Sequence, residues 1–174
     1  HLSIALLILS IILWFIFDIF KIKKFSIKID NSILNIFLIL VILQIILGSF
    51  LAGLNGGLIY NTWPDMNGAF FPNDVQSIDY FSKSLVNDPS IVQLFHRITA
   101  YLILIFLLIL NYNFYKLNLD FKLIVFLDFA ILLQIILGIA TLLTGVEIKY
   151  ASLHQLGSIL VLSSYLLILY KNTN

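Results

Sequence analysis

The stretch Ile91–Tyr101, IVQLFHRITAY, decides the fold, because it places a histidine and an arginine, His96 and Arg97, at the start of a long apolar run. A second stretch, Tyr150–Leu160 (YASLHQLGSIL), places His154 in the same way at the start of another apolar run. An apolar hairpin lies between them. The pattern predicts that His96 and His154 face each other inside a bundle of apolar helices.

The composition is that of an integral membrane protein. Of the 174 residues, 61% are hydrophobic and 11% are charged, whereas soluble domains are about 45–50% apolar and about 25% charged. The net charge of +1 argues against a broad basic surface for nucleic acid. The chain contains no cysteine, which excludes disulfides, thiolate metal sites, iron–sulfur clusters and covalent c-type haem attachment within it.

Five apolar runs are each long enough to cross a bilayer, whose hydrocarbon core takes about 20 apolar residues. They cover residues 2–20, 33–54, 91–110, 123–144 and 150–170. The short turn at residues 145–149 makes the last two runs antiparallel neighbours. Because His1 opens directly into the first run, we expect the chain to be the later part of a longer protein. The prediction is an all-α membrane protein with five transmembrane helices.

The lysines predict the orientation in the membrane. Seven lysines fall on one side, against two lysines and one arginine on the other, so the first side is cytoplasmic or matrix by the positive-inside rule. The three histidines, His1, His96 and His154, then all lie near outer helix ends. His96 is about five residues and His154 about four residues into its run. At ~1.5 Å per residue, both lie roughly 6–8 Å below the outer boundary.

The hexapeptide LQIILG occurs twice, at residues 43–48 and 133–138, an offset of 90 residues. Each copy lies in an outward-running helix that is followed by an inward-running helix with a histidine near its start. Membrane proteins built from repeats often place their site at the repeat interface. We expect the glycines to allow close helix approach and the glutamines to form interhelical hydrogen bonds (Gly48, Gly138, Gln44 and Gln134).

The two facing histidines favour ligation of a haem iron, because a polar side chain at membrane depth is costly and usually functional, and helix bundles hold haem between facing helices. The alternatives are histidines that hydrogen-bond loop carbonyls, or another metal; zinc is disfavoured because further ligands are missing nearby. Arg97 is the one arginine in the chain, and its guanidinium could pair with the carboxylate of a haem propionate. The alternative is that it contacts a phospholipid head group.

The segment of residues 52–72, AGLNGGLIYNTWPDMNGAFFP, is too aromatic for a plain linker. Its glycines, prolines and asparagines predict tight turns, and its aromatic residues suggest a lid with an apolar underside (Tyr60, Trp63, Phe70 and Phe71). An aromatic belt at the membrane surface is the alternative.

Asp128, inside the fourth run, is interpreted as part of a local helix pair or as a side chain that snorkels to the membrane surface, rather than as a proton relay. No carboxylate pair accompanies the histidines, so the chain carries no complete acid–base set.

With these residues in view, the chain resembles the haem A synthase family. The matching pieces are Gln44–Gly68, Val92–Leu102, Leu133–Leu143 and Ser152–Leu160, which together cover most of residues 44–160. A YNTWP loop followed by HR and then by HQ at these spacings is specific to that family.

The resemblance implies an eight-helix protein made of two similar four-helix halves. Residues 1–20 would be the last helix of the N-terminal half, 21–32 a cytoplasmic or matrix loop, and 33–174 the complete haem-binding bundle with its outer loop at 55–90. Haem b would bind between His96 and His154, with further contacts assigned through the same motifs (Arg97, Tyr60, Asn61, Trp63 and Gln155). The substrate, haem O, would bind in the first half, where His1 matches one iron ligand. The family's proposed catalytic glutamate would lie upstream, so this segment alone is expected to be inactive.

The resemblance also implies a reaction, partners and a location. The reaction is oxidation of the C8 methyl of haem O to a formyl group by successive hydroxylations, giving haem A for cytochrome oxidase. The expected partners are haem O and haem A, membrane lipid, haem O synthase and cytochrome oxidase assembly factors, with no nucleic acid and with a homo-oligomer left open. The location is a bacterial plasma membrane or mitochondrial inner membrane, with the haem side facing the periplasm or intermembrane space. The alternatives are a non-catalytic bis-histidine cytochrome b that transfers electrons, and a haem-free membrane scaffold.

Overall fold

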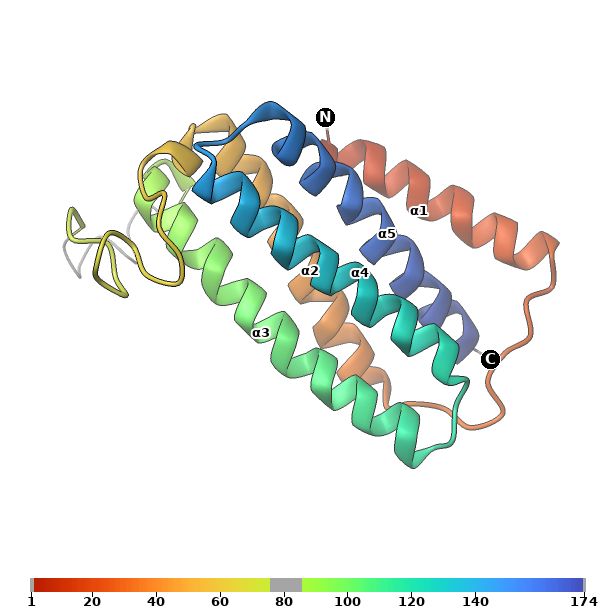
Figure 1. The fold of residues 1–174 in the computed structure, drawn as a ribbon. Helices are drawn as coiled ribbons and strands as arrows, with labels where there is room; N and C mark the ends of the chain where they lie inside the picture. The colour runs from red at the N-terminus through yellow and green to blue at the C-terminus, as the bar shows by residue number, and fades with distance from the viewer. Residues whose placement is uncertain (1, 76–85, 174) are drawn as a thin grey trace.

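The computed structural model describes residues 2–75 and 86–173, which form an all-helical structure (Figure 1). His1 lies outside the described residues, as does part of the expected outer loop. The elements in order are α1 (Leu2–Ile19), α2 (Asn31–Gly53), the short 3-10 helix η1 (Gly56–Leu58), α3 (Pro89–Lys116), α4 (Phe121–Leu143) and α5 (Ile148–Asn172). The predicted all-α membrane fold is confirmed.

Helices α2 to α5 are each long and apolar enough to span a membrane, and α1 contributes a shorter apolar stretch, Ile4–Ile19. The helix ends differ from the predicted runs mainly in α3, which continues past residue 110 to Lys116. The added segment, NYNFYK, is polar but contains neither glycine nor proline, so it continues the helix beyond the apolar run.

Aspartates fix where three of the helices begin. Asp30 accepts a hydrogen bond from the backbone N–H of Ser32 and so caps α2, and Asp120 caps α4 in the same way. Asp88 accepts from the backbone N–H groups of Ser90 and Ile91 at the start of α3, where a proline occupies the first turn. A carboxylate that satisfies free N–H groups, together with proline at the first helical position, is a strong start signal.

The four long helices form a ring. Helix α3 contacts α2 and α4, and α5 contacts α4 and α2, so α3 and α5 stand diagonally across the bundle (Figure 1). Helix α1 lies outside this ring along α5. There the ring of Trp14 packs edge-on against Tyr170, with centroids 5.3 Å apart, and the Tyr170 hydroxyl donates to Asp18 at 2.6 Å.

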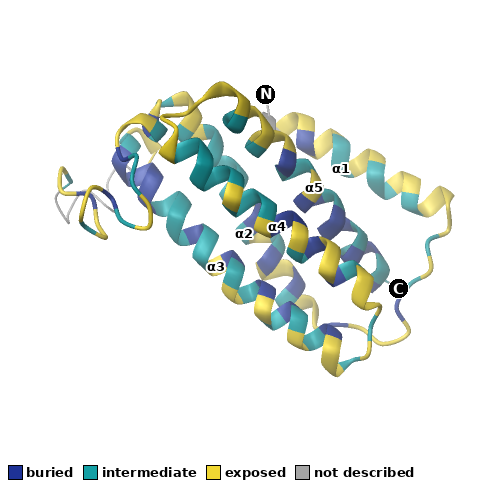
Figure 2. Ribbon diagram, in the orientation of Figure 1, coloured by how far each residue is buried: buried dark blue, intermediate teal, exposed yellow. Residues whose placement is uncertain are grey.

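The apolar core occupies the inner half of the bundle, toward the C-terminus (Figure 2). Its fully buried side chains come from all four long helices: Phe37, Leu110, Ile124, Leu127, Tyr165 and Ile168. In the outer halves of α2, α4 and α5, by contrast, Gly157 is the one buried residue and the other side chains are partly buried or exposed. The outer ends of α2, α4 and α5 are therefore less buried than their inner ends, whereas α3 is buried at its outer end as well, at Ser90–Leu94 and Thr99.

Candidate functional site

The two histidines lie at nearly equal depth in diagonal helices. His96 comes seven residues after the first residue of α3, Pro89, and His154 comes six residues after the first residue of α5, Ile148. At ~1.5 Å per residue these positions lie roughly 9–10 Å from the helix starts, and the predicted 6–8 Å is counted from the apolar runs, which begin two residues later. Because α3 and α5 stand diagonally across the ring of helices, both histidines lie at the same end of the bundle on opposite helices.

Each ring has a buried nitrogen without a hydrogen-bond partner. Nδ1 of His96 and Nδ1 of His154 are both buried, and neither has a partner among the described residues. The side-chain nitrogen of Gln44 lies 3.2 Å from Nε2 of His96. In this amide orientation the N–H group of Gln44 donates, so Nε2 of His96 carries the lone pair and Nδ1 carries the proton. The ring thus presents its lone pair where the amide now lies. The amide oxygen of Gln44 is itself buried without a partner among the described residues, and a flipped amide would accept from a protonated Nε2 instead.

The glycines of the repeated hexapeptide face these rings. A Cβ atom added to Gly48 of α2 would lie 3.2 Å from Cε1 of His96. A Cβ atom added to Gly138 of α4 would lie 3.0 Å from Cε1 of His154. The sequence predicts close helix approach at both glycines, and the structure identifies the approaching groups as the imidazoles.

The two repeated glutamines behave differently. Gln44 forms the predicted interhelical hydrogen bond, to His96. The side-chain nitrogen of Gln134 is buried without a partner among the described residues. It lies directly above Gly157, where an added Cβ atom would be only 1.9 Å away. The interhelical hydrogen bond predicted for Gln134 through this nitrogen is therefore not formed.

These residues fit a bis-histidine haem. A neutral imidazole with a lone pair is the ligand form that iron needs, and the lone pair of His96 now accepts from the amide of Gln44. The outer halves of α2, α4 and α5 offer partly buried apolar side chains on this side of the bundle. A bare metal ion fits less well, because the described residues contain no group of three or more histidine, aspartate or glutamate side chains that could hold one.

Arg97, which follows His96, holds the outer loop. Its guanidinium donates to the carbonyl of Asp65 at 2.6 Å and to that of Thr62 at 3.0 Å, with longer bonds to the carbonyls of Pro64 and Tyr60. The planar fork of arginine suits such an array of acceptors. Its role toward a haem propionate stays a prediction.

The loop residues divide into anchored and exposed ones. Tyr60 is buried and donates to Asp74, and Asn61 donates to the carbonyl of Leu142 in α4 at 2.9 Å. Trp63 is 46% exposed, and Phe70 and Phe71 are more exposed still. The predicted burial of an aromatic underside is therefore wrong for Trp63, Phe70 and Phe71, which stay exposed as the side chains of an interfacial belt would be. Tyr60 and Met66 form the underside instead, packed on Leu94.

Two site residues are exposed, Gln155 on α5 and Trp63 in the loop. Their contacts with a haem stay a prediction. His1, predicted as a ligand of the substrate iron, lies outside the described residues.

The structure adds Gln93 to the site, a residue that the sequence pattern did not single out. Its buried amide donates to the carbonyls of Gly56 and Tyr60, both at 3.2 Å, and its four-residue spacing from Arg97 was the available signal.

Asp128 forms the predicted local helix pair. Asn111 of α3 donates to its carboxylate at 2.8 Å and also to the carbonyl of Leu107 in its own helix. The pair links α3 to α4 in the inner half of the bundle, far along both helices from the histidines. It is a structural contact between helices.

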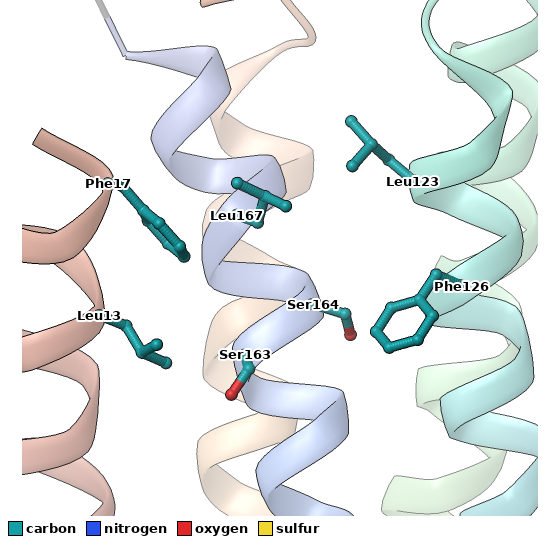
Figure 3. A pocket seen from close by; sticks show the side chains of 7 residues that line it. All are labelled: Leu13, Phe17, Leu123, Phe126, Ser163, Ser164 and Leu167. Carbon is teal, nitrogen blue, oxygen red and sulfur yellow. The ribbon is translucent and has the colours of Figure 1, made fainter. Parts of the chain in front are cut away.

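The described residues include one apolar pocket on the α1 side of α5 and another beside His154. One, of about 240 Å³, lies between α1 and α4 on the surface of α5 and is lined mainly by leucine and phenylalanine with two serines (Figure 3). The other, of about 390 Å³, lies between α4 and α5 and is lined by five leucines and Gly157. Neither is lined by a titratable side chain, so neither competes with the histidines as a reactive site.

Comparisons with known proteins agree on one family. The family model for the cytochrome oxidase assembly protein COX15-CtaA matches residues 1–166. A protein of Pelagibacter ubique (strain HTCC1062) named Heme A synthase is 64% identical over the whole chain, which covers 52% of that relative. Heme A synthases of Wolbachia pipientis (Culex pipiens subspecies) and Rickettsia felis are 39% and 35% identical over 94% of the chain, covering 49% and 50% of those relatives. The chain thus spans about half the length of these relatives. No solved structure matches it.

Proposed function

The chain belongs to the COX15-CtaA family of cytochrome oxidase assembly proteins, and from this we propose that the protein is a haem A synthase whose α2–α5 bundle binds haem b. The observation that carries the proposal is the pair of histidines on diagonal helices. They lie at nearly equal depth, each has a buried unpartnered nitrogen, and the outer halves of α2, α4 and α5 are mostly not buried. The names of the relatives support the same activity.

In this proposal His96 and His154 hold the haem b iron, and the outer halves of the four helices surround the porphyrin with apolar side chains. Haem b, when bound, supplies a one-electron redox centre. The chain's own contribution is to present two neutral imidazoles, to keep water out through the apolar walls, and to cover the outer end with the loop that Arg97 and Gln93 hold.

The synthase reaction needs the whole protein. We propose that it oxidises the C8 methyl of haem O to a formyl group, with oxygen taken from water and electrons passed to an acceptor. The substrate would bind in the half that this chain does not cover, with His1 as one of its ligands and an upstream glutamate as the catalytic residue. The membrane would be a bacterial plasma membrane or a mitochondrial inner membrane, and haem O synthase and cytochrome oxidase assembly factors would be the natural partners.

The ligand assignment is tested by His96→Ala and His154→Ala in the full-length protein. Each change is expected to remove haem b, seen as loss of the reduced-minus-oxidised α band after purification, because one axial ligand alone holds the iron poorly. Ser152→Ala, an exposed position two residues before His154, is the matched control and should keep the band. Full haem b with an unchanged spectrum in both alanine variants would exclude this ligand pair.

A non-catalytic bis-histidine cytochrome b is the competing function, since the same pair of histidines serves it equally well. Product analysis separates the two. Full-length protein supplied with haem O should accumulate haem A if it is the synthase, and should leave haem O unchanged if it only transfers electrons. A purified protein without any Soret absorption would instead indicate a haem-free scaffold.

A further inference from the structure

We propose that the Gln-x-x-x-Gly part of the repeated hexapeptide positions each histidine, so that Nδ1 faces the neighbouring helix backbone and Nε2 is the nitrogen available to iron. The positioning pairs are Gln44 with Gly48 in α2 and Gln134 with Gly138 in α4. The identity of the ligand rests on the function proposed above, whereas the orientation of the rings does not.

The first argument is steric. In an α-helix the carbonyl of residue i bonds to the N–H of residue i+4, so a glycine at i+4 leaves that carbonyl uncovered by a side chain. Gly48 stands in this relation to Gln44, and Gly138 to Gln134. The Cε1 edge of each imidazole lies against its glycine, where a Cβ atom would come within 3.2 Å of His96 and within 3.0 Å of His154. Both distances are shorter than ordinary van der Waals contact.

The second argument is electrostatic. Nδ1 is the buried nitrogen that lacks a hydrogen-bond partner in both rings. A protonated Nδ1 beside a main-chain carbonyl is favourable, and it leaves the lone pair on Nε2. For His96 the Gln44 side chain, 3.2 Å from Nε2, favours the same tautomer.

The third argument is the twofold use of the motif. The hexapeptide recurs after 90 residues, yet the histidines follow at different distances, 48 residues after Gly48 and 16 residues after Gly138. The loops between motif and histidine therefore differ, while in both copies Cε1 of the imidazole is the atom nearest to the glycine. Of the two ring nitrogens, only Nδ1 of His96 comes within 4 Å of a Cβ atom added at Gly48, whereas Nδ1 and Nε2 of His154 would lie 3.5 Å and 3.6 Å from one added at Gly138. A merely structural glycine would not need a histidine partner in both copies.

The test uses Gly48→Ala and Gly138→Ala in full-length protein, with Gly53→Ala as control, because an added Cβ atom at Gly53 of α2 would meet nothing within 4 Å. In haem-free protein labelled with 15N-histidine, His96 and His154 should both show the Nδ1–H tautomer. Gly48→Ala should alter the signals of His96 alone, and Gly138→Ala should alter the signals of His154 alone.

In the haem-loaded protein each change should shift the g values of the low-spin iron. Each change should also weaken haem binding about 10–100-fold, the range for residues that orient a metal ligand.

Wild-type tautomer signals and haem affinity in both alanine variants would overturn the proposal. If an alanine variant fails to fold, Gln44→Leu replaces it, since it leaves the backbone of α2 intact and removes the amide at Nε2 of His96. It should then allow the Nε2–H tautomer of His96, and an unchanged tautomer would count against the role of Gln44. Wild-type protein that binds no haem would refute the proposed function, while the tautomer measurement would still decide the positioning role.

Discussion

At the residue scale, Arg97 decides how the outer loop is held. Its guanidinium serves four loop carbonyls, and alanine would leave those carbonyls without their donor. Arg97→Ala is therefore expected to loosen residues 60–66 by about 1–3 kcal/mol, the cost of hydrogen bonds to a charged group. Hydrogen exchange followed by mass spectrometry should show faster exchange in this loop, while the spans keep their protection.

Lys149 provides the control for Arg97, because it is another cation near an outer helix start. Its ion pair with Glu147 is exposed, with the lysine side chain 62% accessible, and such pairs contribute about 0–1 kcal/mol. Lys149→Ala should leave exchange in the loop unchanged. If both variants speed hydrogen exchange in the loop equally, then positive charge at this end of the bundle holds the loop, rather than the hydrogen bonds from Arg97 to the loop carbonyls.

How much of the site the sequence predicts depends on the kind of signal each residue gives. His96 and His154 stand out because polar side chains are rare in apolar runs, and Gln44 and Gly48 stand out because their hexapeptide recurs. The exposure of Trp63 has no such signal, and the burial of Gln93 has only its four-residue spacing from Arg97. Both depend on how the loop turns above α3, and turn geometry is set by contacts that a linear pattern does not contain.

At the element scale, Asp74 fastens the loop to the start of α3. Its carboxylate accepts from the buried Tyr60 hydroxyl and, at 2.7 Å, from the Ser90 hydroxyl. Asp74→Ala leaves both buried hydroxyls without an acceptor, so we expect a loss of about 1–3 kcal/mol in unfolding free energy. Thermal unfolding in detergent measures it. Asn73→Ala, at the exposed neighbouring position, should leave the unfolding temperature unchanged.

The same contact predicts a pH dependence. Burial alone would raise the pKa of Asp74, but hydrogen bonds from Tyr60, Ser90 and its own backbone outweigh burial and lower the pKa below its ordinary value of 3.8. Since the folded-state pKa lies below the unfolded value, this contribution to stability is complete above pH about 3.8 and is lost as the pH falls through the lowered pKa. Loop protection should therefore persist at pH 5 in the wild type, and acid-induced loosening should disappear in Asp74→Ala. An acid transition that is identical in the variant would locate the titrating group elsewhere.

The helices themselves are predicted well because each signal is local. The apolar runs predict the spans, and the capping aspartates place the starts of α2, α3 and α4 two residues before those runs. The end of α3 is missed because hydropathy marks where the membrane stops rather than where the helix stops. Lys116 belongs to a helix that continues past the bilayer, which only backbone geometry reveals.

At the scale of the whole molecule, the connection between α1 and α2 is wrapped around the end of α5. The backbone N–H of Phe25 donates to the carbonyl of Lys171 at 2.7 Å, and Lys24 donates to the carbonyl of Tyr170 at 3.0 Å. These donors satisfy carbonyls that a helix end leaves free, and the cations also suit the negative end of the helix dipole. The connection thus holds α1 along α5 and closes the inner end of the bundle.

Asn172 is the centre of this closure. Its side chain accepts from the backbone N–H of Ile29 at 2.8 Å and donates to the carbonyl of Ile29 at 3.0 Å and to Asn31 at 3.1 Å. Asn172→Ala would leave both backbone groups of Ile29, which is 2% exposed, without partners, and each such group costs about 1–3 kcal/mol. We therefore expect a clear fall in unfolding temperature together with faster hydrogen exchange across residues 22–30. Asn113→Ala is the matched control, because Asn113 donates only within its own helix, to Ile109. If the two variants unfold alike, the inner end is held by apolar packing of Phe25 and Ile29 alone, and the polar closure contributes nothing measurable.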